Sequence, residues 1–115
     1  MLLSKTNILA AADLPHEDLH VSEWGGQVRI RTLTGTERDA FGQALLGADG
    51  KADMTNYRAR LLASCMVGED GAPLFSPAEV GVLGAKSGAV LDRLFRVADR
   101  LNGLGETAVG VAQGN

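Results

Sequence analysis

The chain has 115 residues, a formal net charge of −3 and a hydrophobic share of 45%. A chain of this length forms one compact domain and little else, and its hydrophobic share is that of a globular protein rather than a disordered one. The acidic balance argues against general binding of nucleic acid. No apolar run approaches the roughly 18 residues of a membrane span. We therefore expect neither nucleic acid nor a membrane as a partner.

Glycine and aromatic contents predict low intrinsic stability. The chain has 15 glycines, and only 4% of its residues are aromatic, so its core is built mainly from aliphatic side chains. A glycine inside a helix costs up to about 1 kcal/mol relative to alanine. We therefore expect the chain to gain stability from copies of itself, as a homo-oligomer, or from a client protein.

The first predicted element is a short helix over residues 5–12. Ser4 is placed to cap it, because its hydroxyl can accept a hydrogen bond from a free backbone N–H, and Pro15 ends the pattern. The same apolar stretch superficially resembles a signal peptide, but it is short, stops at Asp13 and has no clear cleavage region. The single cysteine, Cys65, cannot form an intrachain disulfide, so we expect a cytoplasmic protein.

A β-hairpin is predicted over about residues 19–32, where apolar and polar residues alternate. The glycine pair at 25–26 suits a tight two-residue turn, because glycine adopts positive φ angles without strain. Such a turn pairs Val21 with Ile30 and places Trp24 near the tip of the hairpin.

Helical segments follow the hairpin. Capping-box sequences begin two of them, at Thr34 and at Ser76. Apolar side chains at helical spacing predict the longer helices over about 35–46, 55–66 and 87–102, and Gly103 is placed to end the last one.

Together these elements predict an α+β fold that is mostly helical. One β-hairpin (about 19–32) packs with four to five short-to-medium helices. Residues 1–104 are expected to form a single compact domain, and residues 105–115 a frayed or weakly helical tail.

Residues 16–20 read H-E-x-x-H, a spacing that in zinc peptidases places two histidines on one helical face beside a glutamate that activates water. Here Leu19 and His20 belong to the predicted strand, in which the two histidines cannot project as a helical pair. The sequence also has no third histidine. A minimal zinc peptidase using His16, Glu17 and His20 is therefore the less favoured hypothesis. We expect no catalytic residues, no metal site and no cofactor.

Candidate binding residues gather on the last predicted helix. An apolar stripe of this kind usually forms intramolecular core, but it also suits contact with a copy or a partner helix. Together with the tryptophan of the hairpin, the predicted partner-binding residues are Trp24, Leu91, Leu94, Phe95 and Leu101. Arg93, Arg96 and Arg100 alternate with aspartates on the other side of this helix, which predicts a solvated, salt-bridged face.

The order of motifs along the chain resembles that of the tail assembly chaperones of long-tailed bacteriophages and related prophages. The hairpin carries E-W-G-G at residues 23–26, and the next helix begins with L-T-G-T-E-R-D at 33–39. Later in the chain follow L-D-R-L-F at 91–95 and R-L-N-G-L at 100–104. The resemblance spans nearly the whole chain and departs at 105–115, where glycines stand in place of a more helical, acidic ending.

The resemblance implies a non-enzymatic role. Such chaperones hold the tape measure protein and keep its apolar helices soluble until tail tube subunits polymerise around it. The implied partners are the tape measure protein and, as a second candidate, the tail tube protein. The implied location is the cytoplasm of the host bacterium, with the chaperone absent from the mature virion. An alternative from another class is a structural tail or head–tail joining subunit, which remains in the virion.

Overall fold

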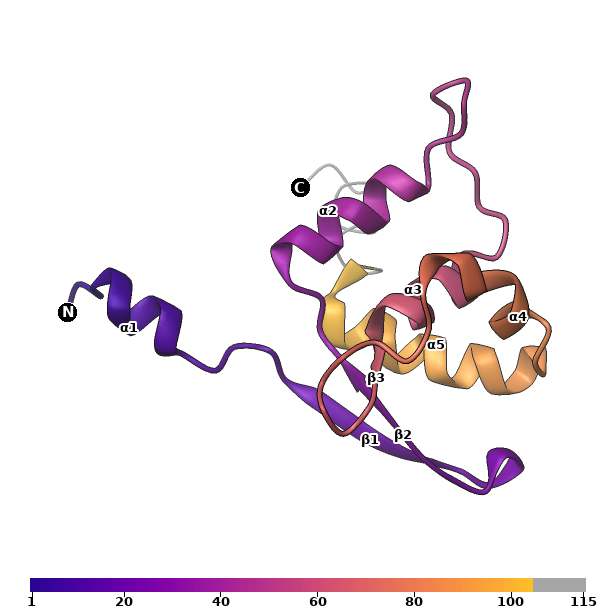
Figure 1. Ribbon diagram of the computed structural model, residues 1–115, viewed down its shortest axis with the longest axis horizontal. Helices are drawn as coiled ribbons and strands as arrows, with labels where there is room; N and C mark the ends of the chain where they lie inside the picture. Colours follow the sequence, from indigo (N-terminus) through magenta and orange to yellow (C-terminus); the bar gives the residue numbers. More distant parts are fainter. Residues whose placement is uncertain (105–115) are drawn as a thin grey trace.

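The computed structural model describes residues 1–104, and the predicted tail at 105–115 lies outside them. The described part contains five α-helices, two 3-10 helices and a three-stranded antiparallel sheet, which confirms the α+β, mostly helical prediction (Figure 1). None of its helices is long and apolar enough to cross a membrane. In chain order the elements are α1 (Lys5–Ala10), β1 (His16–Val21), η1 (Ser22–Trp24), β2 (Gly26–Arg31), α2 (Gly35–Ala44), α3 (Tyr57–Cys65), β3 (Met66–Val67), η2 (Pro77–Glu79), α4 (Val80–Gly84) and α5 (Gly88–Asn102).

The predicted hairpin forms, but in a different register. Val21 lies opposite Gly26, whereas the sequence predicted Ile30 at that position, a shift of four residues. The prediction was wrong because the turn is centred between Glu23 and Trp24, two residues before the glycine pair, and spans four residues instead of two. The 3-10 helix η1 and Gly25 together form it, and Gly25 takes the left-handed conformation with a φ of 77°. As a result the first strand begins at His16.

The third strand, β3, is not predicted by the sequence. The apolar spacing predicts Met66 at the end of a helix over 55–66. In the structure α3 ends at Cys65, and Met66 instead pairs with Ile30 of β2. The backbone oxygen of Met66 also accepts a hydrogen bond from the N–H of Leu74, at 3.0 Å. These partners are distant in sequence, so the local pattern does not reveal them.

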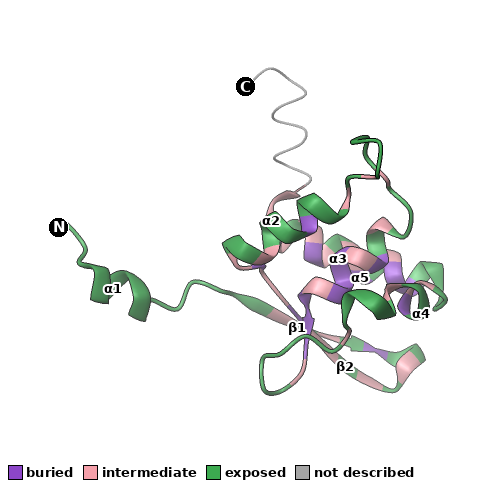
Figure 2. Cartoon of the chain, turned by 45° about the horizontal axis from the view of Figure 1, so that its top comes forward, coloured by how far each residue is buried: buried purple, intermediate pink, exposed green. Residues whose placement is uncertain are grey.

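The hydrophobic core lies where α3 and α5 pack together against the sheet (Figure 2). Five of the nine residues of α3 are buried, more densely than in the other helices. α5 buries one stripe and leaves its other side to charged residues. The largest fully buried side chains are those of Ile30, Leu61, Leu62, Met66, Leu83, Leu94, Val21 and Val90.

Local capping fixes the predicted starts of three helical segments, whereas α1 and α2 each end two residues before the predicted end. Capping boxes are present at Ser4, Thr34 and Ser76. At the second of these, the Thr34 hydroxyl accepts a hydrogen bond from the backbone N–H of Glu37 at 3.1 Å. α5 ends at Gly103, whose φ of 65° confirms its predicted role as a helix stop.

The N-terminal arm, defined as residues 1–15, projects away from the rest of the chain (Figure 1). Its helix α1 has no buried residue. The Cα radius of gyration is 15.6 Å, whereas a compact chain of this length has about 13 Å. The projecting arm contributes to this larger value.

Candidate functional site

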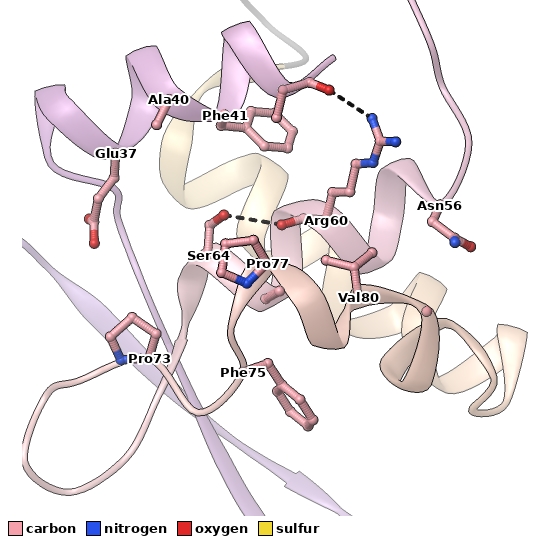
Figure 3. A pocket seen from close by; sticks show the side chains of 13 residues that line it. Glu37, Ala40, Phe41, Asn56, Arg60, Ser64, Pro73, Phe75, Pro77 and Val80 are labelled. Carbon is pink, nitrogen blue, oxygen red and sulfur yellow. Dashed lines mark hydrogen bonds between the residues drawn. The ribbon is translucent and has the colours of Figure 1, made fainter. Parts of the chain in front are cut away.

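An apolar groove lies between α2, α3 and the segment that leads from Pro73 into α4 (Figure 3). Its volume is about 560 Å³, which falls within the range of about 300–1,000 Å³ typical of binding pockets. We call it the α2–α3 groove. It is lined by Glu37, Ala40, Phe41, Ala44, Asn56, Arg60, Ala63, Ser64, Pro73, Phe75, Pro77, Val80 and Gly81.

Apolar side chains form most of the groove wall. Phe41 of α2 is buried, and its ring lies 5.7 Å from that of Tyr57, which holds it in place. Phe75 and Val80 are half-buried on the opposite side, so each still presents apolar surface. They occupy the two staple positions that flank the capping box of η2, which fixes where the chain turns. The groove therefore suits aliphatic side chains.

Glu37 stands at one end of the groove and is already neutralised. Arg31 donates two hydrogen bonds to its carboxylate, at 2.8 and 3.0 Å, and the backbone N–H of Thr34 donates a third at 2.8 Å. The hydrogen bonds from Arg31 lower the pKa of Glu37 to about 2. A molecule bound in the groove therefore cannot form an ion pair with Glu37 without displacing Arg31.

Arg60 is neutralised in the same way at another part of the rim. Its guanidinium donates to the carbonyl oxygen of Ala44 at 3.1 Å (Figure 3). It also donates to the carbonyl oxygen of Asp53 at 3.1 Å and lies 3.6 Å from the Asp53 carboxylate. Glu37 and Arg60 are the charged members of the lining, and both have partners within the chain. A nearly uncharged, apolar partner therefore matches this groove best.

The predicted partner-binding residues do not form one surface. Leu91 and Leu94 are 5% and 0% exposed, so both belong to the intramolecular core. Trp24, Phe95 and Leu101 are half-buried and pack against that core. A binding role for all five residues stays a prediction, but only Trp24, Phe95 and Leu101 present side-chain surface to a partner.

Phe95 and Trp24 lie in different surroundings. Phe95 contacts the ring of Tyr57 edge-on at 5.5 Å, and the guanidinium of Arg58 stands 5.4 Å from the centre of the Phe95 ring. Trp24 lies in the hairpin turn, next to Glu23, whose carboxylate Arg93 of α5 binds at 2.8 Å. That ion pair ties the turn to α5 and holds Trp24 in position.

The arginines of α5 are ion-paired, as the charge pattern predicts. Arg96 pairs with Asp92 on the same helix at 2.9 Å. Arg100 instead reaches the hairpin, where it binds Glu17 at 2.7 Å. Arg93 also binds the hairpin, so two of the three arginines join α5 to the sheet. The sequence does not indicate these pairs, because their partners are 70 and 83 positions away.

The H-E-x-x-H motif lies on β1, where side chains alternate between two faces. His16 and His20 are exposed on one face, while Glu17 is on the other face and binds Arg100. The geometry that a zinc peptidase needs is therefore not formed by these three residues. Residues 1–104 contain no other group of three or more histidine, cysteine or acidic side chains arranged to hold a metal.

Sequence reasoning missed the α2–α3 groove. Each of its apolar residues has a local explanation, such as the helical stripe for Phe41 or the helix staple for Phe75 and Val80. Only the tertiary structure shows that these residues face a common space. The sequence signal that could have indicated it is the pair of small residues Ala40 and Ala44, four positions apart on the side of α2 that Phe41 occupies.

A chain whose cleft is apolar and whose rim charges are paired internally has the character of a protein-binding module. A model of the phage tail assembly chaperone family matches residues 5–112, so the chain belongs to that family. This confirms the resemblance drawn from the motifs, and the family's role is of a non-enzymatic kind.

Among solved structures, the chain is similar to the tail assembly chaperone of bacteriophage HK97. The TM-score is 0.58 at 25% sequence identity, and the match covers 76% of this chain and 85% of that one. A search of curated proteins finds no significant match.

Proposed function

We propose that this chain binds the tape measure protein of its phage and keeps it soluble while the tail tube assembles. The observation that carries the proposal is membership of the tail assembly chaperone family over residues 5–112. A chaperone of this kind carries out no reaction itself, and in this proposal the chain is not an enzyme.

The distribution of apolar surface supports this role. Large apolar side chains stand exposed on the arm, on the loops and on α4, among them Leu9, Met54, Leu74 and Val82. Single exposed apolar residues are ordinary on a protein surface, but those of the arm, Met1, Leu2, Leu3, Ile8 and Leu9, fall within nine residues, and a grouping of this kind is typical of a protein-interaction site. It suits a protein that holds an apolar client and self-associates.

The direct test is co-expression with the tape measure protein. We expect the tape measure protein in the soluble fraction when this chain is present and in the pellet when it is absent. A tape measure protein with equal solubility in both cases would contradict the proposed function.

We assign one client contact to Trp24 at the hairpin turn and a second, separate one to Phe95 and Leu101 on α5. Trp24→Ala is expected to reduce co-purification of the tape measure protein, because a half-exposed indole supplies much contact area at low entropic cost. Gln27→Ala, at an exposed position of the same hairpin, is the matched control. Unchanged recovery with Trp24→Ala, with an unchanged circular dichroism spectrum, excludes the hairpin as a contact.

The proposal also places the protein in the host cytoplasm and outside the mature virion, with the tail tube protein as a second candidate partner. Mass spectrometry of purified virions distinguishes this from a structural tail or head–tail joining subunit. A chaperone is absent or scarce in such particles, whereas a structural subunit is present in stoichiometric amounts.

A further inference from the structure

The N-terminal arm presents apolar side chains that nothing in its own chain covers. Leu2 is 98% exposed and Leu9 75% exposed, and Leu3 and Ile8 are each more than half exposed. Ile8 and Leu9 are neighbours on α1, and Leu3 and Ile8 occupy the staple positions around the Ser4 cap. The arm therefore carries four exposed apolar side chains, two on α1 and two just before it.

A helix as short as α1 needs a partner. It has six residues, and isolated helices shorter than about 12–15 residues are marginal in water. The capping box at Ser4 and Asn7 supplies local support, but both hydrogen-bonding groups are exposed. Docking against an apolar surface supplies the stabilisation that local interactions do not.

We propose that the N-terminal arm of one copy docks in the α2–α3 groove of a second copy. This inference rests on the proposed self-association and names the two surfaces that carry it. The two are chemically matched. Lys5 is the single charged residue among residues 1–12, and the groove is apolar with its rim charges, Glu37 and Arg60, already paired. Neither surface has to give up an ion pair.

The chain geometry favours a second copy over the arm's own groove. The carbonyl oxygen of Pro15 accepts a hydrogen bond from the N–H of Thr32 at 3.1 Å, so strand pairing holds the base of the arm. Only residues 11–14 remain as a connector, which spans at most about 13 Å. The connector leaves α1 in an extended conformation at Ala11 and directs the helix away from α2 (Figure 1). Folding back would require a reversal within four residues.

An arm in a neighbour's groove is a head-to-tail contact. Each copy donates one arm and receives one, so the contact closes as a reciprocal two-fold dimer or as a larger ring, or continues as an open chain. A single short helix in a groove lies at the small end of interface sizes, below about 1,200 Å². The self-association is therefore expected to depend on protein concentration.

The test uses two substitutions in the full chain, one on each surface. Leu9→Glu places a charge at an exposed apolar position of α1, and Ala40→Glu places one in the groove at an exposed position of α2. Matched controls put the same charge on the same helices elsewhere: Ala10→Glu in α1 and Gln43→Glu in α2. Sedimentation velocity over a range of protein concentrations measures the oligomeric state of each variant. We expect multimers for the unmodified chain and both controls, and 12.0 kDa monomers for both test variants.

Mixing the two variants gives the sharper result. Leu9→Glu retains an intact groove and Ala40→Glu an intact arm, so one contact forms between them. The mixture is expected to yield a dimer that grows no further, although each variant alone is monomeric. Recovery of a dimer excludes misfolding as the cause of the monomers. A mixture that stays monomeric, or test variants that keep the size of the unmodified chain, overturns the inference.

Two other occupants of the groove give distinct results, and both overturn the inference. An arm seated in its own groove leaves the unmodified chain monomeric at all concentrations. A client helix in the groove also leaves it monomeric, and Ala40→Glu then loses the tape measure protein. The solubility assay on the same variants separates this inference from the proposed function. Client solubilisation that persists with Leu9→Glu leaves the function standing whatever the oligomeric state.

Discussion

The side-chain oxygen of Asn102 accepts a hydrogen bond from the backbone N–H of Leu33 at 2.7 Å, across 69 positions of the chain. The amide nitrogen of Asn102 donates to the carbonyl oxygen of Ala98 at 2.8 Å and contacts the sulfur of Cys65 at 3.6 Å. Asn102 is 8% exposed. One buried amide therefore joins the end of α5 to α3 and to the segment between the hairpin and α2.

Asn102→Leu is expected to lower the free energy of unfolding by about 1–3 kcal/mol. The substitution keeps the side-chain size but leaves the N–H of Leu33 buried without an acceptor, which costs its full desolvation energy. Urea denaturation followed by circular dichroism measures the change. Gln43→Leu removes an exposed amide from α2 and is the control, with almost no expected effect. Equal stability of the two variants would mean that the Asn102 bridge adds nothing.

The ion pair between Arg31 and Glu37 predicts a dependence of stability on pH. The Glu37 pKa is about 2 in the folded chain, below its ordinary value of 4.5. Because its pKa is lowered in the folded chain, Glu37 stabilises the fold at pH values above its ordinary pKa. This stabilisation is lost as the pH falls from about 4.5 to 2. Both side chains are less than one-third exposed, so we expect Glu37→Gln to cost about 2 kcal/mol at pH 7.

The free energy of unfolding, measured by urea denaturation at pH 7 and at low pH, tests the Glu37 prediction and supplies its control. At about pH 2 much of the difference between the unmodified chain and Glu37→Gln should disappear, because Glu37 itself is becoming protonated. Glu69→Gln, at an exposed position, should leave stability unchanged over the whole range. A constant gap between Glu37→Gln and the unmodified chain would show that the carboxylate charge is not the cause.

Thr32 offers a stabilising substitution. Its hydroxyl oxygen is buried and has no hydrogen-bond partner among residues 1–104. Thr32→Val keeps the shape and removes the unsatisfied hydroxyl, so the free energy of unfolding should rise by about 1 kcal/mol. Thermal and urea denaturation measure it. Thr36→Val, where the hydroxyl is exposed, should give no gain. A loss of stability with Thr32→Val would show that the hydroxyl has a partner in solution.

Cys65 should be unreactive in the folded chain. It is fully buried, and desolvation raises the pKa of its thiol to about 12. Because the thiolate is the reactive form, a thiol reagent at pH 8 should modify Cys65 only when the chain unfolds. Labelling rates with and without urea, read by mass spectrometry, test this. Rapid labelling without urea would place Cys65 in a readily opened part of the structure.

The capped helix starts could be predicted from the sequence because they depend on neighbouring residues. Thr34 and Glu37 are three positions apart, so their capping box is visible in the sequence and forms as predicted. The same holds for the ion pair between Asp92 and Arg96, one helical turn apart. The strand alternation around Glu17 likewise predicted that His16 and His20 do not project as a helical pair, and both lie on β1.

The hairpin register, the third strand and the α2–α3 groove were decided by tertiary contacts. Val21 pairs with Gly26 rather than Ile30 because a 3-10 turn replaces the two-residue turn. Ile30 lies on the central strand, where it pairs with Glu17 of β1 on one side and with Met66 of β3 on the other. The apolar stripe of α5 predicted a helix correctly, but that pattern does not tell whether Leu94 faces its own core or a partner. Local order followed from interactions within one helical turn. Register, burial and the groove depend on residues far apart in the chain, and only packing brings these together.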